Sequence, residues 1–305
     1  RLREGYKMKI MVFDVGGIEI KYSVMDEQMH RTDSGAVPTP QDTQAQFLDT
    51  VYRLYAPHKD EVTGIAMALP GFVDNRTGYV SNGGALLYNT ATPVGKLLAE
   101  KCDCPVILEN DGKAAAMAEL ANGALKDCCN AAVFIIGTGV GGGIIANGQL
   151  VRGVHFTAGE YSFVNTNAEA WDAPDQNMAC QCSTSNLLKW YRARKALPED
   201  APLDGRSFFA AANAGEPEAL EVLRRFCHAV AVQIYNLTVL LDVEKVAIGG
   251  GISKQPLLLE SLRSAYNGLY ASRAGQAYME GLPRCQIVPC AFSSEANQVG
   301  VAAAY

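Results

Sequence analysis

The sequence lacks several features that would point to particular classes of protein. No apolar run reaches the roughly 18–20 residues that a membrane span requires, and no secretory apolar segment lies near the start. No basic stripe is visible, and the formal net charge of −6 argues against binding to a phosphate backbone. We therefore expect neither a membrane nor a nucleic acid among the partners.

Cysteine is present, but it does not form the pattern of a disulfide framework. The nine cysteines are an odd number, and several fall within apolar strand-like or helix-like runs. This pattern favours free thiols in a reducing compartment, so we expect a cytoplasmic protein. Residues 1–7 (RLREGYK) form a polar extension to which the sequence assigns no role.

The order of apolar patterns predicts an α/β fold. The 305 residues suffice for two domains, and strand-like runs alternate with helical patterns. KIMVFDVGGIEIKYSVMD predicts a hairpin at Gly16 and Gly17, and Asn147-Gly148 predicts another. Thr39 and Pro40 predict a helix start. Because both halves open with a strand that ends in a glycine turn, they look like two versions of one plan.

Three glycine clusters follow apolar strands: DVGG at 14–17, GTGVGGG at 137–143 and GGG at 249–251. A turn without Cβ atoms lets several backbone N–H groups point at one anion, usually phosphate. No Gly-Lys-Ser/Thr follows, and the second cluster leads into a strand rather than a helix, so neither a Walker loop nor a dinucleotide motif is present. Each cluster is either a tight structural turn or a cradle for nucleotide phosphates.

The stretch ENDGKAAAMAEL places Asp111 where a strand ends and a helix starts. Helix N-terminal N–H groups keep a carboxylate ionised there. Such a carboxylate can be the general base for an alcohol that attacks phosphorus; the alternative is a simple N-cap. The neighbouring Asn110 adds an amide, and the pair can bond one set of sugar hydroxyls.

The ordered set of motifs resembles the ROK (repressor, open reading frame, kinase) sugar kinases. The matching stretches are FDVGGIEIK, LPGFVD, ENDGKAAAMAE, GTGVGGGIIANGQLVRG, AGEYSFV and IGGGIS, and they span nearly the whole chain. No helix-turn-helix segment precedes residue 10, which favours the kinase branch over the repressor branch. The resemblance implies a two-lobed actin/hexokinase-like (ribonuclease H-like) α/β fold. It also implies ATP-dependent phosphorylation of a sugar with Mg²⁺ in an interlobe cleft, and a homodimer.

The resemblance also implies roles for single residues. Asp111 matches the catalytic base, and Asp14 matches an acid near the metal. The phosphate and adenosine turns correspond to Gly16, Gly17, Gly137, Thr138, Gly139, Gly249, Gly250 and Gly251. The positions that contact the sugar correspond to Gly71, Asn110, Glu160 and Phe163. The implied lobes are residues 1–113 with a closing helix at 292–305, and residues 114–291.

Two departures from the family pattern lie in the phosphate region. Ile18 replaces a threonine, so a hydroxyl that could bond phosphate is missing. Lys113 replaces an asparagine, and it can either reach phosphate or be a solvated cation. These departures motivate an alternative function, a non-catalytic sugar or nucleotide sensor that kept the fold. The sequence does not decide whether the two residues abolish catalysis or tune it.

Further departures affect the family's zinc site. Its histidine is replaced by Phe163, and only Cys180 and Cys182 remain of a ligand set that needs four Cys or His. We therefore expect no structural zinc. Phe163 can stack on a sugar face or fill the space of the lost site. Trp171 is either an exposed lid aromatic or an anchor of its loop.

The sequence therefore predicts an ATP-dependent sugar kinase that transfers the γ-phosphoryl group to a hydroxyl of a hexose, an amino sugar or a β-glucoside. The sequence does not name the sugar.

Overall fold

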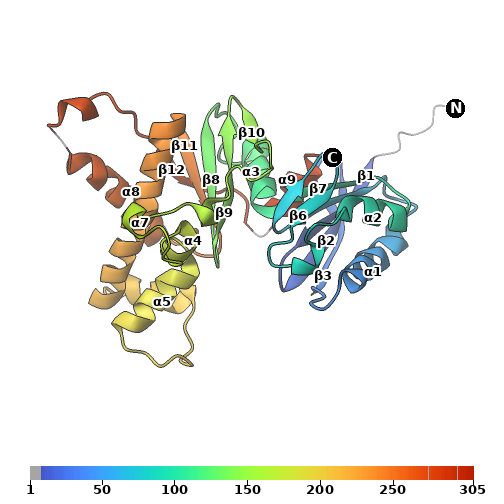
Figure 1. Cartoon of the computed structure of the whole chain (residues 1–305), viewed down its shortest axis with the longest axis horizontal. Helices are drawn as coiled ribbons and strands as arrows, with labels where there is room; N and C mark the ends of the chain where they lie inside the picture. The colour runs from blue at the N-terminus through green and yellow to red at the C-terminus, as the bar shows by residue number, and fades with distance from the viewer. Residues whose placement is uncertain (1–7, 274, 294) are drawn as a thin grey trace. The chain divides into compact units, whose positions relative to one another are not determined.

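A computed structural model describes residues 8–273, 275–293 and 295–305 (Figure 1). Within this part of the chain there are two compact units. The first contains residues up to 121, residues 152–158 and the C-terminal residues from 295; the second contains residues 122–151 and 159–293. The lobe bounds expected from the family resemblance stay a prediction.

The first unit is built on a five-stranded mixed sheet with the order β3-β2-β1-β4-β7. The hairpin at Gly16 and Gly17 makes β1 and β2 antiparallel, and β4 and β7 continue the sheet parallel to β1. The strands are β1 (Lys9–Val15), β2 (Glu19–Asp26), β3 (Arg31–Pro38), β4 (Ile65–Leu69) and β7 (Val106–Asn110). A separate hairpin pairs β5 (Phe72–Asp74) with β6 (Tyr79–Asn82).

The second unit repeats this plan. Its sheet has the order β10-β9-β8-β11-β12, with an antiparallel β8–β9–β10 meander followed by two parallel strands. The strands are β8 (Ala131–Ile136), β9 (Val140–Ala146), β10 (Gln149–Val151), β11 (Lys245–Gly249) and β12 (Gln286–Pro289). The two sheets thus share order and direction, which confirms the expected α/β class and the repeated plan.

Alternating side chains give the first sheet two buried faces. Met11, Phe13 and Val15 of β1 pack in the cluster that contains Phe47 and Leu98 of the helices α1 and α2. The alternate residues of β1 pack in a second cluster, against residues of α3 and α9. The helices are α1 (Gln44–Tyr55), α2 (Val94–Cys102), α3 (Asp111–Asn122) and α9 (Ala296–Ala302).

The predicted start of α1 is wrong by four residues. The N-cap is Thr43, whose side chain accepts a hydrogen bond from the backbone N–H of Gln46. Thr39 instead donates its hydroxyl to the carbonyl of Gly16 at 2.7 Å. A long-range partner therefore uses the side chain that the local pattern assigned to the helix.

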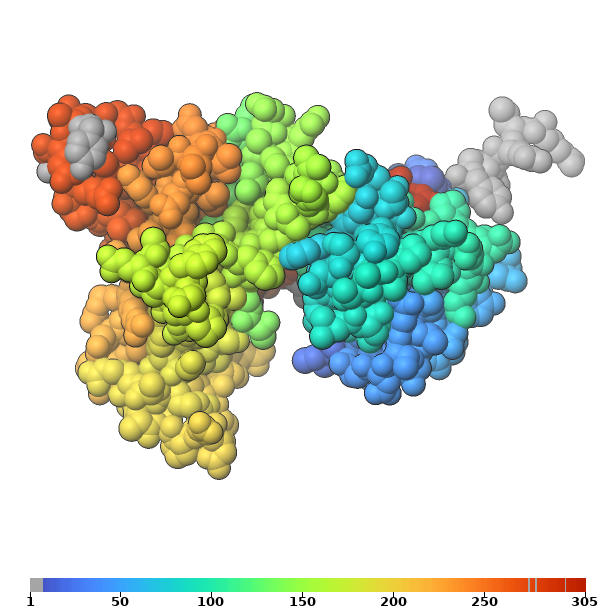
Figure 2. All heavy atoms as spheres, viewed as in Figure 1, coloured from blue at the N-terminus to red at the C-terminus, as the bar shows by residue number. Residues whose placement is uncertain are grey.

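One large core fills the second unit on the face of its sheet that α7 and α8 cover. Phe226, Val230 and Ile234 of α7 are buried against Phe134 of β8 and Val246 of β11. The helices are α4 (Met178–Gln181), α5 (Thr184–Arg194), α6 (Gly205–Asn213), α7 (Pro217–Leu241) and α8 (Pro256–Ala271). In Figure 2 the yellow-green segment that contains α4 lies on the surface of this unit that faces the viewer. None of the helices in the described ranges is long and apolar enough to cross a membrane.

Candidate functional site

In the first unit, the candidate residues gather at the carboxyl edge of the sheet. Asp14 pairs with Ala68 of β4, and Ala68 pairs with Glu109 of β7. Asn110 is the last residue of β7 and Asp111 the first of α3. Two strand spacings, roughly 10 Å, separate the backbones at Asp14 and Glu109. This edge is where open α/β sheets bind ligands.

The turn from β7 into α3 is held by Asn110. Its Nδ2 donates to the carbonyl of Gly71 at 2.8 Å, and its Oδ1 accepts from the backbone N–H of Lys113 at 3.0 Å. The second bond is the capping bond of α3. Asn110, rather than Asp111, is therefore the residue that caps this helix. The Oδ1 of Asp111 accepts from the N–H of Gly112 at 2.8 Å.

The carbonyl that anchors Asn110 belongs to a position that requires glycine. Gly71 has a φ of +93°, and a Cβ there would lie 2.0 Å from the carbonyl oxygen of Asn82. A side chain would be strained by the backbone conformation and would clash. The structure thus brings Gly71, Asn110 and Asp111 together, and their roles towards a sugar stay predictions.

Asp14 lies in a partly buried position beside the β1–β2 hairpin. Its Oδ1 accepts from Nδ2 of Asn297 at 2.8 Å. Burial raises the pKa of Asp14, and the hydrogen bond from Asn297 partly opposes that rise. The carbonyl of Gly17 accepts from Nε2 of Gln41 at 2.7 Å. Ile18 is 87% exposed and takes no part in the core.

Two charged residues next to the turn from β7 into α3, Lys113 and Glu109, are buried. Lys113 is 1% exposed, so it is not the solvated cation that one alternative described. Glu109 is also 1% exposed. Its Oε2 atom lies 2.9 Å from Nε and 2.8 Å from Nη2 of Arg152. This ion pair was not predicted from the sequence. The available signal was a carboxylate inside the apolar strand PVILEN.

In the second unit, two glycine turns lie side by side at the carboxyl edge. Gly249 pairs with Ile135, and a Cβ on Gly250 would lie 2.1 Å from the carbonyl oxygen of Ile136. Gly250 has a φ of +97°, so the fold itself requires glycine there. A Cβ on Gly137 or Gly251 would meet nothing within 4 Å. Packing therefore does not require glycine at those two positions.

A cavity of about 400 Å³ adjoins the first of these turns. Thr138 lines it together with residues of α5 and α7, among them Asn186, Lys189 and Arg225. The Nδ2 atom of Asn186 is buried and has no hydrogen-bond partner within the described residues. The guanidinium of Arg225 lies over the ring of Trp190 at 3.7 Å from its centroid. The pocket therefore offers polar donors next to a predicted phosphate turn.

Glu160 and Phe163 flank a short 3₁₀ helix, η3 (Tyr161–Phe163), which the core anchors. Tyr161 is buried and donates its hydroxyl to the carbonyl of Gly143 at 3.0 Å. Phe163 is 71% exposed, so it does not fill the space of a lost zinc site. Trp171 is 77% exposed, which likewise contradicts its interpretation as a loop anchor.

The remaining cysteines of the zinc motif differ in environment. Cys182 is buried, and burial raises the pKa of its thiol to about 12, which disfavours the thiolate that zinc binds. Cys180 is partly exposed, with its Sγ 3.8 Å from the carbonyl of Pro174. Among the residues described, no group of three or more His, Cys, Asp or Glu is arranged to hold a metal. The absence of structural zinc stays a prediction.

Comparison with known proteins identifies the family. The family model described as "ROK family" matches residues 10–304. The chain belongs to the ROK family. This ROK protein is 30% identical over 258 residues to the beta-glucoside kinase of Listeria innocua, covering 84% of this chain and 87% of that one. It is also 30% identical to the N-acetyl-D-glucosamine kinase of Vibrio atlanticus, covering 82% and 86%.

A solved structure agrees with this assignment. A ROK family protein from Streptococcus pneumoniae, in complex with sucrose, is 28% identical, has a TM-score of 0.84 and covers 96% of each chain. The predicted two-lobed actin/hexokinase-like fold is confirmed. The predicted class of enzyme, a ROK-type sugar kinase, is confirmed as well.

Proposed function

We propose that this ROK kinase transfers the γ-phosphoryl group of ATP to a hydroxyl of a hexose, an amino sugar or a β-glucoside, with Asp111 as the general base. The observation that carries the proposal is the turn at the end of β7. There the Asn110 side chain, bonded to Gly71 and Lys113, takes over the capping of α3. Asp111 is therefore not the cap of α3, which argues against the simple N-cap alternative and supports its role as the base.

The proposed reaction needs one proton acceptor and a site for phosphate charge. The Asp111 carboxylate accepts the proton of the attacking sugar hydroxyl while the new O–P bond forms and the bond from the γ-phosphorus to the ADP oxygen breaks. When bound, Mg²⁺ neutralises charge on the phosphates, and Asp14 is the carboxylate that would hold it or its water ligands.

The second unit has glycine turns and a cavity that are suited to binding the nucleotide. The open space at Gly137 and Gly251 is of the kind that a phosphate oxygen fills, because backbone N–H groups can approach it where a Cβ would intervene. The cavity beside Thr138 is of a size for part of a nucleotide and has a buried amide donor in Asn186. We assign the phosphates to the turns at Gly16, Gly17 and 137–139, and adenosine to the turn at 249–251.

On the sugar side, we assign Gly71, Asn110, Glu160 and Phe163 to substrate binding. The exposed rings of Phe163 and Trp171 are suited to stacking on a sugar or on the aglycone of a β-glucoside. A cytoplasmic location and a homodimer are further proposals, the first from the cysteine pattern and the second from the family resemblance.

Sugar phosphate formation across a panel of hexoses, amino sugars and β-glucosides with Mg²⁺ATP tests the proposal. We expect turnover on at least one sugar above the ATPase background, and its loss in Asp111→Asn. Titration calorimetry run in parallel addresses the sensor alternative, which requires sugar binding without any transfer. Binding without product for every sugar of the panel would refute the kinase and support the sensor.

A further inference from the structure

We propose that Glu109 and Arg152 form a positioning pair that fixes the location of the catalytic base. The inference rests on the proposed function, because it assumes that Asp111 is that base. Neither residue is among those assigned above to ATP or the sugar, although both lie within stretches that resemble the family. Their effect reaches Asp111 through Asn110, the residue between Glu109 and the base.

Glu109 links the ion pair to the backbone of the turn. Its Oε2 pairs with Nε and Nη2 of Arg152, and its Oε1 accepts a hydrogen bond from the backbone N–H of Asn110 at 3.0 Å. The side chain of Glu109 is 2% exposed. A buried carboxylate of this kind is tolerated only when its partners satisfy it, so the orientation of Glu109 depends on Arg152.

Asn110 transmits that orientation to the next residue. Its backbone N–H is bonded to Glu109, its Nδ2 to the carbonyl of Gly71, and its Oδ1 to the N–H of Lys113. These bonds come from β7 itself, from the turn after β4 and from the first turn of α3. Asp111 follows directly, so the position of its backbone, from which the carboxylate projects, depends on these bonds.

Arg152 reaches this turn from a separate stretch of chain. Residues 152–158 belong to the first unit, although the chain on either side of them belongs to the second. Within the segment, the carbonyl of Arg152 accepts from the N–H of Ala158 at 3.2 Å. The Nη2 atom also lies 3.5 Å from Sδ of Met117 on α3. Lysine cannot place two N–H donors with the fixed spacing of a guanidinium.

Steady-state kinetics on four variants tests the pair: Arg152→Met, Arg152→Lys, Glu109→Gln, and Arg152→Met combined with Glu109→Gln. We expect Arg152→Met to lower kcat by roughly 10- to 100-fold, because a displacement of about 1 Å of a reacting group has effects of this size. The KM for ATP should stay within about twofold. The kcat of Arg152→Lys should lie between that of the parent and that of Arg152→Met.

The double variant separates positioning from general damage. Glu109→Gln removes the buried charge that Arg152→Met leaves unpaired, while its amide oxygen can still accept from Asn110. The double variant should therefore have a higher kcat than Arg152→Met alone. A kcat of Arg152→Met within threefold of the parent, or a double variant no faster than Arg152→Met, would overturn the proposal. If Arg152→Met does not fold, the kcat values of Arg152→Lys and Glu109→Gln are compared with that of the parent instead, and values within threefold of the parent for both would overturn the proposal.

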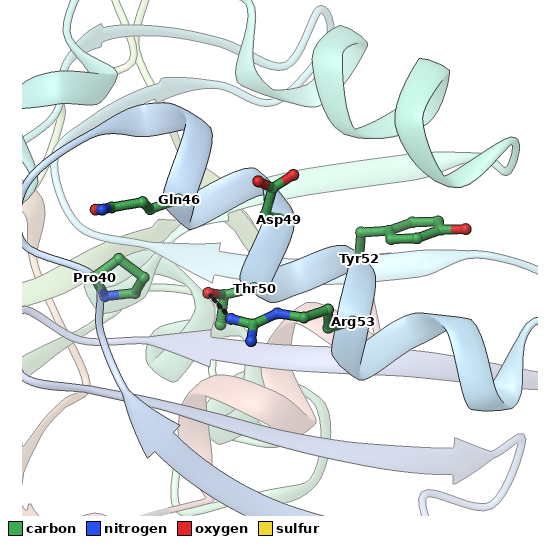
Figure 3. A pocket seen from close by; sticks show the side chains of 6 residues that line it. All are labelled: Pro40, Gln46, Asp49, Thr50, Tyr52 and Arg53. Atoms are coloured by element: carbon green, nitrogen blue, oxygen red, sulfur yellow. Dashed lines mark hydrogen bonds between the residues drawn. The ribbon is translucent and has the colours of Figure 1, made fainter.

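Arg53→Met is the matched control. Arg53 lies on α1 in the same unit, and its Nη2 donates to Oγ1 of Thr50 at 3.0 Å on a surface pocket (Figure 3). Its loss should leave kcat within twofold of the parent. The failure of the proposed function would look different: either the parent makes no sugar phosphate, or Asp111→Asn retains the parent rate.

Discussion

Alanine substitutions at two glycines can separate a structural turn from a phosphate cradle. Gly137 and Gly250 both follow strands of the second sheet, and the sequence left both interpretations open. A Cβ on Gly137 meets nothing within 4 Å, whereas a Cβ on Gly250 meets the carbonyl oxygen of Ile136 at 2.1 Å. Gly137→Ala should therefore affect binding, and Gly250→Ala should affect folding.

The structure gives a rough size for each effect. Gly250→Ala forces a φ of +97° on a residue with a side chain, which costs about 1–3 kcal/mol before the clash is relieved. A total near 3 kcal/mol would lower Tm by roughly 6–12 °C. Gly137→Ala carries no such strain and should raise stability by up to about 1 kcal/mol, because the unfolded chain loses freedom.

The expected binding effect of Gly137→Ala follows from the hydrogen bonds that the methyl group would obstruct. A bond to a charged partner contributes about 1.5–3 kcal/mol, so the KM for ATP should rise roughly 10- to 100-fold. Differential scanning calorimetry on both variants gives the change in Tm, and ATP titrations at saturating sugar give the change in the KM for ATP. A Gly137→Ala protein with parental stability and a KM for ATP within twofold of the parent would refute the phosphate cradle at this turn.

Four further predictions follow from the same residues. Asp111→Asn should lower kcat by roughly 10²–10⁴-fold with little change in sugar affinity by calorimetry. Burial raises the pKa of Asp14 above its ordinary value of 3.8, so its ionised form destabilises the fold. Asp14→Asn should then raise Tm at pH 7, with the difference vanishing below about pH 4, and should raise the Mg²⁺ concentration for half-maximal rate. Metal analysis should find no zinc at Cys180 and Cys182, and a chelator should leave Tm unchanged. Asn186→Leu should raise the KM for ATP several-fold without changing the KM for sugar, as titrations of each substrate would show.

Much of the fold could be predicted from the sequence because its signals are local. The turn residues of the two hairpins, Gly16-Gly17 and Asn147-Gly148, lie within a few residues of the apolar strand runs that they join. The long helix α7 (Pro217–Leu241) likewise coincides with one continuous, mostly apolar stretch. The order of such elements was enough to indicate two copies of one plan.

The contacts that hold the site could not be predicted in this way. Glu109 and Arg152 are 43 residues apart in the chain, and no local pattern pairs them. The same holds for Thr39, which bonds Gly16 across 23 residues instead of capping a helix. The burial of Lys113 also escaped the sequence analysis, because the first turn of a helix usually exposes a lysine.

The repeated plan gives the two units equivalent edges with opposite chemistry. At the edge of the first sheet, polar side chains lie at or next to the ends of the strands: Asp14, Asn110 and Asp111. At the edge of the second sheet, the turns at 137–139 and 249–251 carry backbone N–H groups and no carboxylate. Carboxylates at the first edge can accept a proton or hold a cation, whereas the glycine turns at the second edge can donate backbone hydrogen bonds to an anion. One repeated plan therefore supplies two different parts of the proposed transfer, the proton acceptor from the first unit and most of the phosphate donors from the second.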